Sequence, residues 1–286
     1  MEKVKEQVGF KGSLQSFFNY LNTDKKFFPF HSEKEVLQAF HTVHDSIMPQ
    51  LNTIFDMVPR TRFEIHQTEK FREASASAEY KQGTADGKRP GIFYVPILDA
   101  TTFNTTSGME SLFLHEAIPG HHYQISLTME NTGLPTFRRF LWYGAYGEGW
   151  ALYCESLGKE LGLYTDPYQY AGALGDEMHR AIRLVVDVAM HAKNMTREQA
   201  IAYMMENEAI SEEGATAEIE RYMALPAQAL SYKIGALKIR ELRNKYSQQL
   251  QNKFMLSAFH DEFLHFGCMP LELVEKNMDS WAAASK

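Results

Sequence analysis

Three histidines and a glutamate lie within eight consecutive residues of this sequence. His115 and Glu116 are followed, across a Pro-Gly pair, by His121 and His122. Neutral imidazole and carboxylate are ligands that zinc prefers in proteins. A glutamate next to the first histidine is the kind of residue that acts as a base toward a metal-activated water. This combination predicts a Zn²⁺ centre that carries out hydrolysis, with Glu116 as the general base.

The spacing of the histidines does not fit a regular zinc-binding helix. Two histidines four residues apart share one helix face and bind one ion, but the residue four positions after His115 is Pro119. On an ideal helix His122 returns to nearly the same side but lies about 10 Å further along the axis, and His121 points elsewhere. A bulge at Pro119 and Gly120 can bring His121 onto the ion. From the spacing alone, both histidines stay candidates for the second ligand.

A second acidic motif follows as Gly147-Glu148-Gly149-Trp150, with another glutamate at position 155. A catalytic zinc site typically has three protein ligands and an open fourth position. Glu148 is the candidate third ligand, because it comes from a later helix. Glu155 lies seven residues further along the same helix face. We expect Glu155 to accept a hydrogen bond from a histidine ligand and so to orient its ring.

Hydrolysis of an amide at a zinc site builds negative charge on the carbonyl oxygen, which a tyrosine or histidine donor commonly stabilises. Tyr232 is the first candidate donor, and Gln228, four residues before it on the same helix face, is a candidate substrate contact. His191 is a second candidate donor, one helical turn after Asp187, which can orient it. Each pair has a structural alternative, namely a core tyrosine and a histidine satisfied within its own helix.

Two further features are candidates for substrate binding. The guanidinium of Arg183 can bind the terminal carboxylate of a peptide with two parallel hydrogen bonds, although a salt bridge to Asp187 is the simpler alternative. The segment 91–98 is aromatic and β-branched and predicts a strand, and Pro96 favours an edge position for it. An edge strand can pair with an extended peptide, so Tyr94 is a candidate substrate contact; a buried strand is the alternative.

Most of the chain has the hydrophobic period of α-helices, so we predict a mainly α fold with a small sheet or edge strand beside the zinc helix. Residues 1–90 are expected to form a helical segment and a polar loop, with a loop or surface hairpin over 74–89. Residues 91–286 are expected to form the catalytic region, continuous with the first part. The helix that carries His115 is expected to start near Ser107. Thr196 with Gln199 has the spacing of a capping box, which marks a helix start.

Composition limits the remaining possibilities. The chain has 286 residues, 44% of them hydrophobic, and a formal net charge of −7. Its basic residues are scattered, which argues against nucleic-acid binding. The two cysteines cannot form a disulfide framework, and no apolar run reaches membrane-spanning length. The first residues lack the apolar segment of a signal peptide, so we expect a soluble chain, whose parent protein is either exported (periplasmic or a lipoprotein) or cytoplasmic. Oligomeric state is not set by the sequence.

The segment His-Glu-Ala-Ile-Pro-Gly-His-His-Tyr-Gln at 115–124 resembles the signature of a large bacterial family labelled domain of unknown function 885. Further segments resemble the same family, at 147–151, 183–191, 196–200 and 226–235. The resemblance covers most of the chain from about Phe93 onward. Members of the family are usually longer, so the resemblance implies the C-terminal, catalytic portion of a longer protein.

The family is grouped with the zincin-type metallopeptidases, which implies a zincin-like fold, zinc and a peptide substrate. It resembles most the helical enzymes of the angiotensin-converting-enzyme, thimet-oligopeptidase and thermostable-carboxypeptidase type. Those enzymes have a glycine directly before the second zinc histidine, which matches Gly120 and implies His121 as the ligand. They also take a glutamate ligand from a following helix, which matches Glu148. The insertion between the histidines is longer here, and dipeptidyl peptidase III also carries an insertion in its zinc helix.

Three functions therefore compete. The leading hypothesis is a zinc peptidase that hydrolyses peptide bonds through a metal-activated water with Glu116 as general base. The same residues can hydrolyse a non-peptide amide or ester. The third hypothesis is a non-catalytic fragment that binds peptides.

Overall fold

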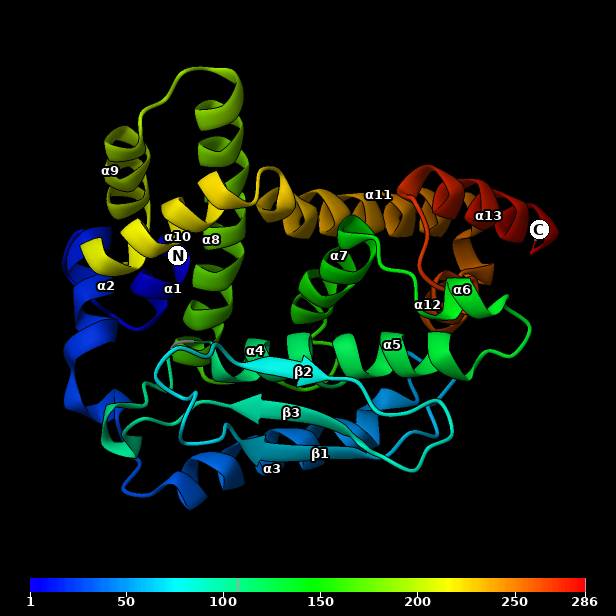
Figure 1. Cartoon of the computed structure of the whole chain (residues 1–286), viewed down its shortest axis with the longest axis horizontal. Helices are drawn as coiled ribbons and strands as arrows, with labels where there is room; N and C mark the ends of the chain where they lie inside the picture. Colours follow the sequence, from blue (N-terminus) through cyan, green and yellow to red (C-terminus); the bar gives the residue numbers. More distant parts are fainter. Residues whose placement is uncertain (107, 286) are drawn as a thin grey trace.

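The computed structural model describes residues 1–106 and 108–285 and is mainly helical, with one small sheet (Figure 1). Ser107, near which we expected the helix carrying His115 to start, lies outside the described residues, and that helix is described from Met109. The α-helices are α1 (Glu2–Gln7), α2 (Leu14–Thr23), α3 (Glu33–Leu51), α4 (Met109–Glu116), α5 (His121–Glu130), α6 (Thr136–Arg139), α7 (Gly144–Glu155), α8 (Pro167–Ala192), α9 (Arg197–Asn207), α10 (Glu212–Ala224), α11 (Ser231–Leu250), α12 (Leu256–His265) and α13 (Leu271–Ala284).

The sheet has three strands, in the spatial order β1 (Phe63–Gln67), β3 (Gly91–Val95) and β2 (Glu79–Lys81). β1 pairs with β3 in parallel and β2 pairs with β3 in the antiparallel direction, with Tyr80 opposite Phe93. The prediction that the strand before Pro96 is an edge strand is wrong, because β3 is central. Pro96 directly follows the last residue of β3, so its missing N–H removes no ladder hydrogen bond.

Helices cover one face of the sheet. They come from both parts of the chain, before and after residue 90, and join these parts in one hydrophobic core. Phe93 of β3 is fully buried and packs edge-on against Phe40 of α3, at a ring-centroid distance of 5.2 Å. Phe113 of α4 packs against the same ring at 6.4 Å. Because Phe40 precedes residue 90 and Phe113 follows it, both parts contribute to the same hydrophobic core.

The other helices form two groups around this centre. α7 packs closely along α11, and α8 contacts α9, α10 and α4 (Figure 1). The close approach of α7 and α11 depends on two facing glycines. A Cβ on Gly149 would lie 2.4 Å from Cα of Gly235, and a Cβ on Gly235 would lie 1.9 Å from the carbonyl oxygen of Ala145. Both contacts are with backbone, so neither position has room for a side chain.

The predicted capping box of Thr196 and Gln199 is confirmed, since both of its reciprocal hydrogen bonds are present at the start of α9. Cys154 and Cys268 are both buried and free. Among the described residues, no helix combines the length and apolar character needed to cross a membrane.

Candidate metal centre

The Pro-Gly pair does not form a bulge within one helix, but separates two helices. α4 ends at Glu116 and α5 begins at His121, so His115 lies in the last turn of one helix and His121 opens the next. A Cβ on Gly120 would lie 1.9 Å from the carbonyl oxygen of His115. Only glycine allows α5 to start this close to the end of α4. The imidazole rings of His115 and His121 consequently lie 4.9 Å apart, at 86° to each other.

α7 holds this break from the other side. The indole Nε1 of Trp150 donates a hydrogen bond of 2.9 Å to the carbonyl oxygen of Pro119, and both groups are buried. This bond satisfies a carbonyl that the interrupted helix leaves without an intrahelical partner. Since Trp150 lies two residues after Glu148 on α7, the same helix anchors the break and supplies the acidic side chain.

His115, His121 and Glu148 each offer a ligand atom within 4.8 Å of the other two. The Oε2 atom of Glu148 lies 3.7 Å from Nε2 of His115 and 3.3 Å from Nε2 of His121. Ligand atoms at tetrahedral positions around zinc lie about 3.4 Å apart, given metal–ligand distances near 2.1 Å. The two measured separations agree with that value. The donor set, two imidazoles and one carboxylate, therefore fits a zinc ion.

Glu155 contacts the opposite ring nitrogen of His115. Its Oε1 atom accepts a hydrogen bond from Nδ1 of His115 at 2.7 Å, and both side chains are buried. This bond places the proton on Nδ1 and leaves Nε2, which faces Glu148, free to bind a cation. The contact is the one we expected of Glu155.

The carboxylates make this position favourable for positive charge. Burial opposes a charged His115, but hydrogen bonds with Glu148 and Glu155 outweigh burial and raise the pKa of His115 to about 10. Burial likewise opposes the charge on Glu148, but its contacts with His115 and His121 hold the pKa of Glu148 well below its usual range. A divalent cation would meet the same favourable field.

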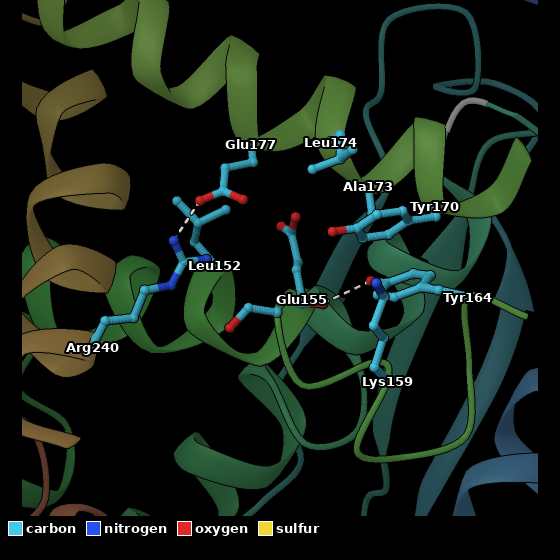
Figure 2. A pocket seen from close by; sticks show the side chains of 10 residues that line it. Leu152, Glu155, Lys159, Tyr164, Tyr170, Ala173, Leu174, Glu177 and Arg240 are labelled. Atoms are coloured by element: carbon cyan, nitrogen blue, oxygen red, sulfur yellow. Dashed lines mark hydrogen bonds and ion pairs between the residues drawn. The ribbon is translucent and has the colours of Figure 1, made fainter. Parts of the chain in front are cut away.

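A cavity of about 90 Å³ lies beside Glu155 (Figure 2). Tyr164 closes one side, where its hydroxyl donates a hydrogen bond of 2.7 Å to the main-chain oxygen of Glu155. The ion pair of Arg240 with Glu177 lies on another side. A cavity of this size and polarity has room for water. Polar and apolar side chains both line the cavity, and the buried Oε2 atom of Glu155 has no hydrogen-bond partner among the described residues.

His122 is directed away from the cluster. Its Nδ1 atom lies 3.0 Å from the Tyr80 hydroxyl and 3.4 Å from the Ser126 hydroxyl, and its ring packs against Phe63. Burial lowers the pKa of His122 to about 4. The structure therefore places His122 between α5 and the sheet, as a neutral ring.

The cluster opens into a cleft of about 560 Å³. Glu116 lines the cleft, and its Oε2 atom accepts a hydrogen bond of 2.8 Å from the main-chain N–H of Tyr80 on β2. The base candidate is thus held at the edge of the sheet, in the same cleft as the His115, His121 and Glu148 cluster. The cleft is lined by Ser77, Ala78, Glu79, Tyr80, Leu112, His115, Glu116, His121, Ile125, Trp142, Glu148, Arg180, Arg183, Glu218, Arg221 and Tyr232.

Tyr232 and Arg183 also reach the cleft. The ring of Tyr232 stacks on His115 at a centroid distance of 6.1 Å. The guanidinium of Arg183 also lies over that tyrosine ring, with Cζ 4.9 Å from the ring centroid. Arg183 is buried, and it donates hydrogen bonds to Tyr222 (2.8 Å) and Glu218 (2.9 Å). The salt-bridge alternative for Arg183 thus involves Glu218 and not Asp187.

Three other candidates lie outside the residues that line the cleft. Asp187 is buried at the far end of α8, where both of its carboxylate oxygens lie 3.2 Å from the main-chain N–H of Ala227. His191 contacts the main-chain oxygen of Asp187 at 2.8 Å. Gln228 accepts a hydrogen bond of 3.0 Å from Arg221, which does line the cleft. Asp187 therefore fixes the turn after α10, His191 packs on Asp187, and Gln228 acts on the cleft through Arg221.

Tyr94 also lies away from the cleft, because β3 is the central strand. Its ring packs against His66 and under the guanidinium of Arg72. It lines a separate hollow beside Arg72. The edge that faces the cleft belongs to β2, which lies in the stretch we predicted to be a polar loop or surface hairpin.

The cleft contains residues that the sequence reasoning did not single out. Tyr80 lies on a three-residue strand, which is too short to show an alternating pattern. Trp142 precedes α7, and its ring lies 5.9 Å from His121. Arg180 is one helical turn before Arg183, so a search along that helix face could have found it.

The model of the family described as "Bacterial protein of unknown function (DUF885)" matches residues 1–278 of the chain. The chain belongs to this family. Among curated proteins, no relative of this family member is found.

Two solved structures share the fold of this family member. One is described as the "putative lipoprotein from Colwellia psychrerythraea"; it is 37% identical, with a TM-score of 0.94, over 99% of this chain and 49% of that chain. The other, a "putative lipoprotein of unknown function from Shewanella oneidensis", is 23% identical, with a TM-score of 0.80, over 96% of this chain and 52% of that one. The chain thus spans about half the length of both.

Proposed function

We propose that this family member is a zinc-dependent peptidase with a zincin-like centre, in which His115, His121 and Glu148 bind the metal. The observation that carries the proposal is the convergence of this ligand set, the oriented histidine and a separate carboxylate, Glu116, in one cleft. A zinc ion held there supplies a Lewis acid that polarises a carbonyl group and makes a water molecule more acidic.

The chain's own residues supply the remaining steps. Glu116, fixed by the N–H of Tyr80, accepts a proton from the attacking water and delivers it to the leaving amine. Tyr232, stacked on His115 at the cleft wall, donates a hydrogen bond to the carbonyl oxygen as negative charge develops there. Water thereby adds a hydroxyl to the acyl carbon and a proton to the amine, which balances the hydrolysis of one peptide bond.

The strand β2 favours a peptide over a small amide or ester. β2 pairs on one side with β3, and the N–H of Tyr80 points to the other side, toward Glu116. The C=O of Tyr80 faces the same edge as its N–H, and Ala78, directly before the strand, also lines the cleft. An extended peptide can pair with this edge.

Metal content and peptide cleavage test the proposal together. We expect about one zinc per chain by elemental analysis, and cleavage of a peptide library that a chelator abolishes. Glu116→Gln should retain zinc and lose cleavage by at least about 100-fold, whereas Glu148→Ala should lose both. Glu160→Gln, a matched change at a partly exposed glutamate paired with Arg243, should leave both unchanged. Zinc-independent cleavage, or full activity of Glu116→Gln, would refute the proposal.

A further inference from the structure

The two ends of the cleft differ in chemistry. Three arginines line the end formed by α8 and α10, namely Arg180, Arg183 and Arg221. Ile125 of α5 and Trp142 line the other end. In Figure 1, α8 and α10 lie beyond one end of β2, and α5 and α6 extend past the other end. A peptide along β2 would therefore have one terminus near positive charge and the other over apolar side chains.

The three arginines differ in how their N–H donors are hydrogen-bonded within the protein. Arg183 is held by Glu218 and Tyr222, which use its Nε donor and one donor of Nη2. Arg180 has a looser environment. Its Nη1 atom lies 3.8 Å from Asp176, beyond hydrogen-bond range, and its buried Nε atom has no hydrogen-bond partner among the described residues.

Tyr232 connects these arginines with the metal ligands. Its ring centroid lies 6.1 Å from that of His115, 5.7 Å from Cζ of Arg180 and 4.9 Å from Cζ of Arg183. An extended peptide advances about 3.3–3.6 Å per residue. A chain whose scissile bond lies at the metal ligands therefore reaches Arg180 within a few residues.

The acidic side chains at the arginine-lined end of the cleft do not cancel the positive charge there. Glu218 is shared by Arg183, His179 and Tyr222, which already surround its carboxylate. Arg221 is 3.9 Å from Glu218 and donates to Gln228, so its side chain is positioned at the cleft without a close ion pair. Glu218 thus faces two of the guanidinium groups and is also bound by a histidine and a tyrosine, while the third, Arg180, faces Asp176 at 3.8 Å.

We propose that Arg180, supported by Arg221, binds the C-terminal carboxylate of the peptide substrate, so that the enzyme removes short C-terminal fragments. This inference rests on the proposed function for the cleavage step, but carboxylate binding can be measured without it. A guanidinium with an unused Nε donor is suited to bidentate carboxylate binding. The leaving fragment carries the free carboxylate, and its new amine takes the proton that Glu116 received.

The direct test compares an N-acetylated hexapeptide with its C-terminal amide, which has the same sequence and lacks the negative charge. With zinc-loaded protein, kcat/KM for the acid should exceed that for the amide by at least about tenfold, mainly through KM. Mass spectrometry should show loss of short fragments from the C-terminus. Equal rates for acid and amide, or cleavage confined to internal bonds remote from the C-terminus, would overturn the inference.

Variants separate binding from a structural role. Arg180→Gln should lower kcat/KM for the acid peptide to the value for the amide peptide, and should change kcat/KM for the amide less than about twofold. Arg180→Lys should give a kcat/KM for the acid between those of wild type and Arg180→Gln. Arg197→Gln, on the surface of α9 where Arg197 pairs with Glu220, is the matched control and should retain the preference for the acid. If Arg180→Gln slows both peptides equally, its role is structural and the inference fails.

A binding measurement keeps the inference testable even if neither peptide is cleaved, which would count against the proposed function. Calorimetric titration of the Glu116→Gln variant with the same two peptides should give a Kd at least about tenfold lower for the acid. Adding Arg180→Gln should remove this difference. Equal affinities, or no binding of either peptide, would overturn the carboxylate site independently of catalysis.

Discussion

Nδ1 of His115 and Oε1 of Glu155 lie 2.7 Å apart, and both side chains are buried. A carboxylate in this position fixes the tautomer of a ligand histidine and increases the basicity of its other nitrogen. Glu155→Gln should keep the ring oriented and remove the charge. We expect it to weaken zinc binding by about 10–100-fold, measured by competition with a chelator of known affinity.

The control for this change is Glu160→Gln, on the segment after α7, where the side chain pairs with Arg243 at 3.1 Å. It should leave zinc affinity unchanged. Glu155→Ala, which removes the hydrogen bond as well, should weaken binding further than Glu155→Gln. Unaltered affinity in both Glu155 variants would mean that His115 does not need this partner to bind a cation.

Gly120 controls the break between the two histidine-bearing helices. A Cβ at this position would lie 1.9 Å from the His115 carbonyl oxygen and 2.3 Å from that of Leu114. Gly120→Ala should force the two helix ends apart, lower the free energy of unfolding by about 2–4 kcal/mol and weaken zinc binding at least about tenfold. Urea unfolding of the metal-free protein and chelator competition measure the two effects.

Gly175 provides the matched control for Gly120. It lies within α8, and a Cβ there would meet no atom within 4 Å. Gly175→Ala should raise the free energy of unfolding by about 0.5–1 kcal/mol, because alanine loses less backbone entropy in a helix. A Gly120→Ala variant as stable as wild type would show that α4 and α5 can separate without cost.

Tyr232 is placed to act on a reacting carbonyl, since its ring stacks on His115 within the cleft. Tyr232→Phe should lower kcat by about 100-fold or more and leave zinc affinity within twofold, because only a hydrogen bond to developing charge is lost. Tyr203→Phe on α9, whose side chain packs in a separate cluster, is the control. An unchanged kcat in Tyr232→Phe would assign this tyrosine to packing alone.

Features carried by short sequence patterns were predictable. The capping box of Thr196 and Gln199 has a fixed spacing and a local mechanism, and both of its hydrogen bonds are present. The mainly helical character followed from the hydrophobic period. His115, His121 and Glu148 were candidate ligands from residue type and order, and the structure brings their side chains together.

Other features depend on contacts between distant parts of the chain. The separation of α4 from α5 requires Gly120 to pack on the His115 carbonyl and Trp150 to bind the Pro119 carbonyl, and no local pattern encodes either contact. The central position of β3 could not be deduced from Pro96, because that residue lies just outside the strand. The spacing of His191 and Asp187 shows that the two residues share a face of α8. It does not show that the cleft lies at the other end of this helix, so His191 could not be excluded from the cleft by its sequence position.

His260 makes the stability of the fold dependent on pH. It is fully buried, its Nδ1 donates to the main-chain oxygen of Ile54 at 2.8 Å and its Nε2 accepts from Tyr153 at 2.8 Å. Burial lowers the pKa of His260 from 6.5 to about 3, against the raising effect of the bond to Ile54. The unfolded chain therefore binds a proton that the folded protein excludes. The contribution of neutral His260 to the free energy of unfolding is therefore fully present above about pH 6.5 and is lost as the pH falls toward 3.

We expect this histidine to contribute a loss of roughly 1 kcal/mol per pH unit between pH 6.5 and pH 5. His260→Asn, which keeps a donor for Ile54, should be less stable at pH 7.5 but show a smaller loss over this range. His41→Asn, at an exposed position on α3, should retain the wild-type slope. Urea unfolding at a series of pH values measures both. If the His260→Asn slope equals that of wild type, the acid sensitivity must come from other groups, because His260 is then not the site at which the unfolded chain gains its extra proton.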